Sequence, residues 1–117
     1  MDIKRLYTLE EHENGAEIQI NSPIDDKPTD FYVKVKGVDS KAYRDSVRKY
    51  HRKLLNDEDG GDLDLLASIT IGWKGLTDGK TNIEFTVEAA RDLYENAPHV
   101  ASQIDRFIAD RVNFMNG

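Results

Sequence analysis

The chain has 117 residues, 38% of them hydrophobic, which suits one domain with a modest core. It contains no cysteine, which excludes thiol nucleophiles, cysteine-bound zinc and iron–sulfur clusters and fits a reducing compartment. The net charge of −6 repels nucleic acid and anionic lipid when averaged over the molecule, and no stretch reads as a secretory signal or a membrane span. We therefore expect a cytosolic protein that contacts neither nucleic acid nor membrane.

The first third of the chain predicts two short strands. After the turn signal Asn14-Gly15, apolar and polar residues alternate over 16–21, and they alternate again over 31–36. The segment between them contains Pro23, Pro28 and several Asp residues, so we expect a loop over 22–30. The pattern predicts an antiparallel hairpin over residues 16–36, preceded by a loosely ordered segment over 1–15.

A strongly amphipathic helix is expected next. Asp39 or Ser40 can cap its start, and its apolar side repeats at steps of four, three and four residues, through Tyr43, Val47, Tyr50 and Leu54. The opposite face holds six basic residues against the single acid Asp45. These basic residues are Lys41, Arg44, Arg48, Lys49, Arg52 and Lys53. The sequence thus places a local basic face on an acidic molecule.

The central stretch, residues 63–85, contains the only tryptophan and follows an acidic loop over 56–62. Leu66, Ile69, Trp73 and Leu76 recur at helical spacing, which predicts one buried helix stripe ending near Gly72 to Gly75. The β-branched residues 69–71 favour a strand as the alternative. A turn over 77–79 and an extended segment over 80–85 complete this part.

Two helices are expected at the end of the chain. Thr86 can cap the first, which Asn96 and Pro98 would stop, and the last would run to Met115 with an ion pair between Arg106 and Asp110. The inward residues of the two helices are Val87, Ala90, Leu93, Tyr94, Val100, Ile104, Phe107, Ile108, Arg111 or Val112, and Met115. The predicted fold is α+β: a single domain over 1–117, with the N-terminal antiparallel β-hairpin packed on about four α-helices and residues 39–115 forming the helical part.

No motif in the chain requires an enzyme, a cofactor or a metal. Residues 75–81 resemble a phosphate-binding loop, but Lys74 stands where its first glycine must be. The acidic run that starts at Asp57 has Gly61 and Ser68 where an EF-hand needs ligands. The three histidines have no metal-binding spacing, so we expect His12, His51 and His99 at the surface or at helix ends. A nucleophile-elbow sequence is also missing.

The basic face of helix 41–53 leaves three interpretations open. It can be a solvated face balanced by nearby acids, a docking surface for an acidic or helical partner, or a nucleic-acid contact. Tyr43 and Tyr50 lie on the apolar side, which favours core packing over base stacking.

Several local patterns resemble the tail assembly chaperones of long-tailed bacteriophages, from about Ile18 onward. The patterns are Ser22-Pro23-Ile24-Asp25 in the early loop, Gly37-Val38-Asp39-Ser40-Lys41-Ala42-Tyr43-Arg44 opening the basic helix, Ile71-Gly72-Trp73, Ile83-Glu84-Phe85-Thr86, and Asp110-Arg111-Val112-Asn113-Phe114.

The resemblance implies a non-enzymatic protein of the host bacterial cytoplasm that is absent from the mature virion. It would bind the tape measure protein and keep it soluble while tube subunits assemble. It implies the short form, with possible partners in a second copy and in a frameshifted longer form. We expect Arg44, Arg48 and Arg52 at the rim of the partner site, with Phe114 and Met115 as apolar contacts or, alternatively, as core. The rival hypotheses are a small nucleic-acid-binding regulator that uses helix 41–53 and a minor structural tail protein.

Overall fold

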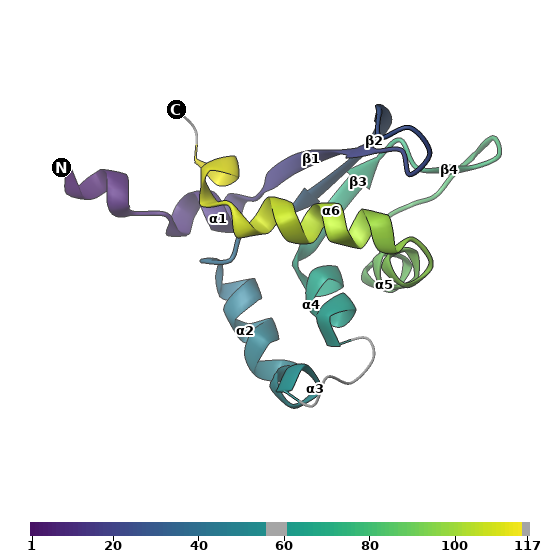
Figure 1. The fold of residues 1–117 in the computed structure, drawn as a ribbon. Helices are drawn as coiled ribbons and strands as arrows, with labels where there is room; N and C mark the ends of the chain where they lie inside the picture. Colours follow the sequence, from purple (N-terminus) through teal and green to yellow (C-terminus); the bar gives the residue numbers. More distant parts are fainter. Residues whose placement is uncertain (56–60, 116–117) are drawn as a thin grey trace.

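A computed structural model describes residues 1–55 and 61–115 (Figure 1). The N-terminal part forms η1 (Ile3–Leu6), α1 (Leu9–Asn14), β1 (Ala16–Asn21) and β2 (Pro28–Val35). The middle forms α2 (Lys41–Lys49), α3 (His51–Leu55), α4 (Gly61–Ile69), β3 (Thr70–Lys74), β4 (Thr77–Asp78) and β5 (Thr81–Asn82). The C-terminal part forms α5 (Val87–Asn96), α6 (Pro98–Ala109) and η2 (Arg111–Phe114).

The expected hairpin is present as an antiparallel pair of β1 and β2. Ile18 lies opposite Val33 and Ala16 lies opposite Val35, so the apolar residues of the two strands share one face. β2 begins at Pro28, three residues before the expected start, and a hydrogen bond from Ser22 N to Lys27 O at 2.9 Å closes the shortened loop.

The expected central helix is wrong in its second half. α4 ends at Ile69, and the chain continues as β3, which pairs antiparallel with the free edge of β2. Trp73 therefore lies opposite Val33 in a sheet of order β1-β2-β3. Leu76, the last residue of the expected helix stripe, likewise lies outside the helix. The cause is tertiary. The unpaired edge of β2 offers backbone hydrogen bonds to a third strand, and the β-branched residues Thr70 and Ile71 favour an extended backbone over a helical one.

The basic helix is shorter than expected. Ser40 caps α2, because its hydroxyl accepts the Tyr43 N–H at 3.1 Å, but the helix ends at Lys49 and α3 follows in a new direction. The break brings α3 against α4. The side chain of the expected stripe residue Leu54 and the acidic loop residues 56–60 lie outside the described part of the chain.

The last two helices begin as expected, but the final one stops early. Thr86 caps α5 by accepting the Ala89 N–H at 2.9 Å, and Pro98 stands in the first turn of α6. α6 ends at Ala109 because Asp110 has an extended backbone and its carboxylate accepts the Val112 N–H at 3.2 Å. Asp110 caps η2 in this way, and the expected ion pair with Arg106 does not form.

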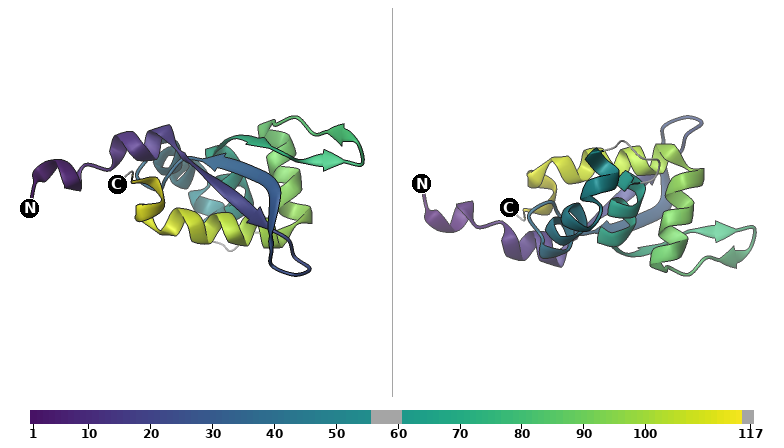
Figure 2. Two further views of the ribbon diagram at one scale, coloured as in Figure 1. Left: turned by 90° about the horizontal axis from the view of Figure 1, so that it is seen from above. Right: turned by 90° about the horizontal axis from the view of Figure 1, so that it is seen from below.

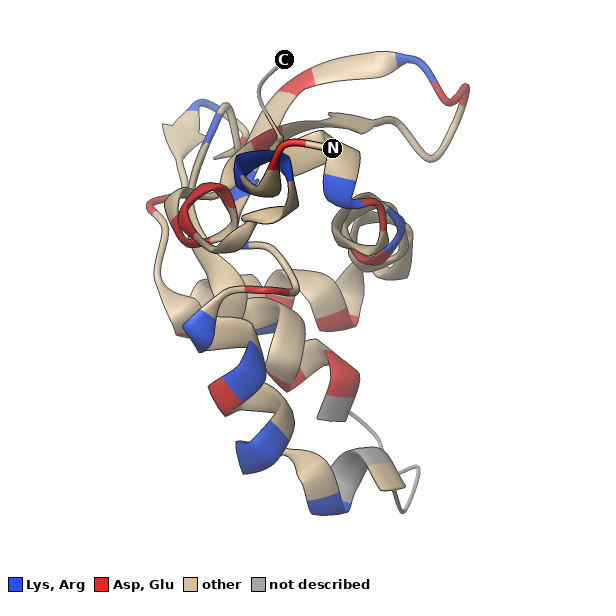
Figure 3. Cartoon of the chain, turned by 90° about the vertical axis from the view of Figure 1, so that its left-hand side faces the viewer, with Lys and Arg blue, Asp and Glu red and all other residues tan. Residues whose placement is uncertain are grey.

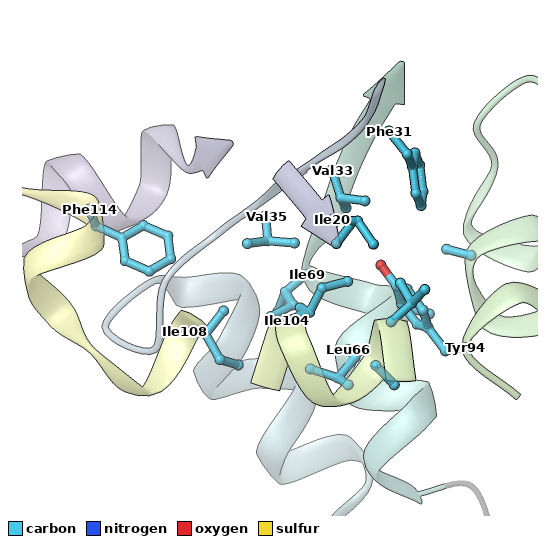
Figure 4. Packing of buried hydrophobic residues seen from close by; sticks show 14 residues of the cluster. Ile20, Phe31, Val33, Val35, Leu66, Ile69, Tyr94, Ile104, Ile108 and Phe114 are labelled. Carbon is cyan, nitrogen blue, oxygen red and sulfur yellow. The ribbon is translucent and has the colours of Figure 1, made fainter. Parts of the chain in front are cut away.

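The core lies between the sheet and the helices. Figure 2 shows α4, α5 and α6 on one side of the sheet, and Figure 4 shows Val33, Val35, Ile69, Ile104 and Tyr94 pointing toward one another. Tyr94 is fully buried, and its hydroxyl hydrogen-bonds Thr70 Oγ1 at 2.6 Å. The opposite face of the sheet is polar. The α+β character is thus confirmed, with a three-stranded sheet in place of the hairpin alone.

Candidate functional site

The basic face of α2 and α3 is exposed, and its residues differ in how they are paired. Lys41 donates to Asp45 at 2.8 Å, and Arg48 also pairs with Asp45, which lowers the pKa of that carboxyl. Arg44 reaches only the carbonyl oxygen of Ser40, at 3.4 Å. Within residues 1–55 and 61–115, Arg44 and Arg52 have no carboxylate partner. Figure 3 shows Lys and Arg positions, in blue, along α2 and α3.

A groove of about 500 Å³ lies beside this face, above α4 and between Tyr50 and α5. We call it the α4 groove. Ala67 of α4 is buried at its base and Val87 of α5 is 48% exposed at its side. Tyr50 carries the Lys49 ammonium 5.3 Å from its ring centroid, so one wall is basic. The other wall is acidic and consists of Glu88, Asp92 and Glu95 of α5.

Arg91 is the polar residue that joins α4 to α5 at this groove. Its Nε donates to Asp64 Oδ1 at 2.7 Å, and its Nη1 lies 3.4 Å from a carboxylate oxygen of Glu95. The hydrogen bond to Asp64 raises the pKa of Arg91. Because both contacts use the guanidinium, Arg91 holds the groove walls in place and adds little free charge to them.

A second polar cluster joins three distant segments through His12. Of the two positions expected for this histidine, the helix end is confirmed, because His12 lies in the last turn of α1, and the surface is not. The side chain is fully buried, its Nδ1 accepts the Asp39 N–H at 3.0 Å, and its ring lies 4.8 Å from the Phe114 ring. Its Nε2 has no hydrogen-bond partner in the described residues and lies 3.7 Å from Asp39 Oδ2. Burial lowers the pKa of His12.

Asp39 is the centre of this cluster. Its carboxylate accepts two hydrogen bonds from Arg111, each 2.9 Å long, and one from the Thr8 hydroxyl at 2.5 Å. The Arg111 guanidinium holds the pKa of Asp39 far below its usual range. A side chain at Gly37 would meet His12 Nδ1 at 2.1 Å, so the close approach requires glycine here. The cluster ties α1, the segment before α2 and η2 together.

The expected apolar contacts at the C-terminus divide between core and surface. Phe114 is 3% exposed and packs on His12 and Phe107. It therefore belongs to the core, which was the alternative to a partner contact. Met115 is half-buried. The sequence also contained a signal for α1, which packs against Phe114 through His12. Thr8 followed by Glu11 has the spacing typical of a helix start.

The turn that resembles a phosphate loop is a hairpin of β4 and β5, in which Gly79 has a φ of +62°. Among the described residues, no three His, Asp or Glu side chains are grouped as metal ligands would be. Across residues 1–55 and 61–115, no helix combines the length and the apolar character needed to cross a membrane.

Comparisons with protein-family models, with curated proteins and with solved structures give no match for this chain.

Proposed function

We propose that this protein is a non-enzymatic tail assembly chaperone that binds an amphipathic helix of a phage tape measure protein in the host cytoplasm. The α4 groove is the observation that carries the proposal. The ordered sequence patterns given above support the family, and the groove supports the mode of binding. A helix presented by a tape measure chain before its tube exists carries apolar residues that would otherwise aggregate.

The α4 groove has the features of a site that holds one face of a helix. Tyr50 and Val87 offer apolar surface, above the buried Ala67, to residues spaced at three and four along the partner. The two walls carry opposite charge, with Lys49 on one side and Glu88 and Asp92 on the other. A bound helix with acidic and basic flanks would be held in a single orientation, because like charges across either wall repel.

The three expected rim residues differ in how much charge they can offer a partner. Among the described residues, Arg44 and Arg52 have no carboxylate partner and can attract acidic side chains of the partner, whereas Arg48 is already paired with Asp45. We therefore assign Arg44 and Arg52 to steering the partner toward the groove, an effect that salt weakens.

The contacts of the described residues give the nucleic-acid alternative less support. Asp45 takes up Lys41 and Arg48, and Tyr43 packs against the core, so no aromatic residue of α2 is placed to stack on a base. A duplex titration at rising salt distinguishes the two functions, since a phosphate-binding face loses affinity steeply. The rival role as a minor tail component is tested by the protein content of purified particles.

Co-expression with the tape measure protein encoded by the neighbouring gene tests the α4 groove. Val87→Asp replaces an apolar side chain of the α4 groove by a charge, and we expect the soluble fraction of the tape measure protein to fall to the level seen without this chain. The measurement is the soluble fraction together with co-purification.

The matched control is Val112→Asp, which charges another exposed valine, 66% exposed and outside the groove. It should keep the tape measure protein soluble. The proposed function would be contradicted if the tape measure protein were equally soluble with and without the wild-type chain. It would also be contradicted if tail length were unchanged when the gene for this chain is deleted.

A further inference from the structure

Residues 1–9, which we call the N-terminal arm, project from one end of the molecule (Figures 1 and 2). The hydrogen bonds that residues 1–7 make within the described chain stay inside the arm, and none of the η1 residues is buried. Its apolar side chains are between 51% and 96% exposed; they are Met1, Ile3, Leu6, Tyr7 and Leu9. Five such side chains within nine residues form an apolar surface with no cover.

The arm also carries a local positive charge. Lys4 and Arg5 stand between the apolar residues, and neither has a carboxylate within ion-pair distance in the described chain. A four-residue helical turn is not stable in isolation, because few hydrogen bonds oppose the loss of backbone freedom. The arm is therefore suited to an acidic surface with an apolar base.

The described residues provide such a surface at the other end of the molecule. A groove of about 580 Å³, the α5–α6 groove, has apolar residues at its base, among them Leu66 and Ala101. Its rim carries Asp62, Glu95 and Asp105. Asp62 and Asp105 form no ion pair among the described residues, while Arg91 is engaged by Asp64 and Glu95. A groove of this volume holds a few side chains.

We propose that the N-terminal arm of one copy docks in the α5–α6 groove of a second copy. Ile3 and Leu6 lie on the apolar base, and Lys4 and Arg5 face the carboxylates of Asp62 and Asp105. The two surfaces are opposite in sign of charge and alike in apolar character, which is the pattern of a short helical segment held in a groove.

The positions of the two surfaces determine the type of assembly. The arm leaves one end of the body, and α5 and the first turns of α6 lie at the other end (Figures 1 and 2). Thr8 is held to Asp39, which directs the arm away from its own groove. Each copy therefore offers one arm and one groove on different faces, so association is head to tail and continues beyond a dimer, as a ring or an open chain.

The test uses the purified chain alone and does not depend on the proposed chaperone function. In sedimentation velocity at rising concentration, we expect the wild-type mass to increase beyond two copies, and to fall back when salt is raised. Ile3→Asp/Leu6→Asp and, separately, Asp62→Lys/Asp105→Lys should each sediment at the 13.3 kDa mass of one chain. All four residues are exposed, so circular dichroism should stay unchanged.

Two mixing experiments make the result specific. An equimolar mixture of the arm variant and the groove variant retains one intact arm and one intact groove, so it should form a one-to-one pair and nothing larger. The charge swap Lys4→Glu/Arg5→Glu/Asp62→Lys/Asp105→Lys should restore higher assembly. Ile24→Asp, which charges a side chain that is 93% exposed and outside both surfaces, should behave as wild type. A wild-type chain that stays monomeric, or variants that do not pair on mixing, would overturn the proposal.

Discussion

His12 shows how one buried side chain can make this fold depend on pH. Its Nδ1 accepts the Asp39 N–H, so the neutral ring carries its proton on Nε2, and a second proton would replace an acceptor by a donor. The native state therefore binds protons less readily than the unfolded state, whose histidine has the ordinary pKa of 6.5. Asp39 acts in a separate window, because its pKa is lowered from 3.8.

We expect the free energy of unfolding to decrease as pH falls below about 6.5, by about 1.4 kcal/mol for each unit by which folding lowers the pKa of His12. The decrease ends at the folded-state pKa, because both states are then protonated. Urea denaturation between about pH 7 and pH 5 measures it.

His12→Asn keeps an acceptor for the Asp39 N–H but does not titrate there, so its stability should lose this slope. His51→Asn changes an exposed histidine and should keep it. A wild-type protein whose stability is flat over this range would contradict the assignment.

At the scale of elements, Trp73 decides how the β4–β5 hairpin is held. Its Nε1–H donates to Ile83 O at 2.9 Å, and its ring meets Phe31 and Phe85 at centroid distances of 6.0 and 5.1 Å. Gly75 lets the chain turn there, with a φ of +83° and no room for a side chain beside Asp30 O. The indole ring of Trp73 thus connects the end of the hairpin to the sheet.

We expect Trp73→Leu to release the hairpin without unfolding the domain, because both the hydrogen bond and the aromatic contacts are lost. Trypsin should then cleave after Lys80 at least several times faster than in wild type, as mass spectrometry of the fragments would show. Ile71→Leu, an exposed change on the same strand, serves as the control and should leave the cleavage rate unchanged. Slow cleavage in Trp73→Leu would mean that the β4–β5 pairing alone holds the hairpin.

At the scale of the whole molecule, the cluster around Asp39 and Phe114 connects the two ends of the chain. Phe114 packs on His12 of α1 and on Phe107 of α6, so a segment near the C-terminus covers one near the N-terminus. The N-terminal arm starts from this cluster, because Thr8 donates to Asp39. The direction of the arm therefore depends on contacts made by residues near the other end of the sequence.

Phe114→Ala should lower the free energy of unfolding by about 3 to 5 kcal/mol, since it leaves a cavity against a buried ring. Hydrogen exchange should show loss of protection in α1 as well as in η2, because His12 loses its cover. Met115→Ala removes a half-buried neighbour and should cost less than half as much. If the α1 amides stay protected in Phe114→Ala, the two ends are held together by Asp39 and Arg111 alone.

Local patterns were sufficient for the elements whose hydrogen bonds close within a few residues. Alternation predicted the first two strands, Ser40 and Thr86 predicted helix starts, and Pro98 marked a helix boundary. These signals succeed because the capping oxygen and the amide it accepts are neighbours in the chain. The basic face of α2 was also visible, since charge at helical spacing needs no tertiary information.

The grooves and the buried histidine could not be predicted in this way. The α4 groove combines Tyr50, Ala67 and Val87, which come from separate elements, and the His12 cluster joins residues 8 to 114. Leu66, Ile69 and Trp73 have helical spacing, yet the open edge of β2 takes the chain after Ile69 into the sheet. The sequence by itself determined composition, charge and the local helix and strand signals. Only the tertiary structure decided where α4 ends and which side chains meet, because strand pairing and burial depend on partners distant in sequence.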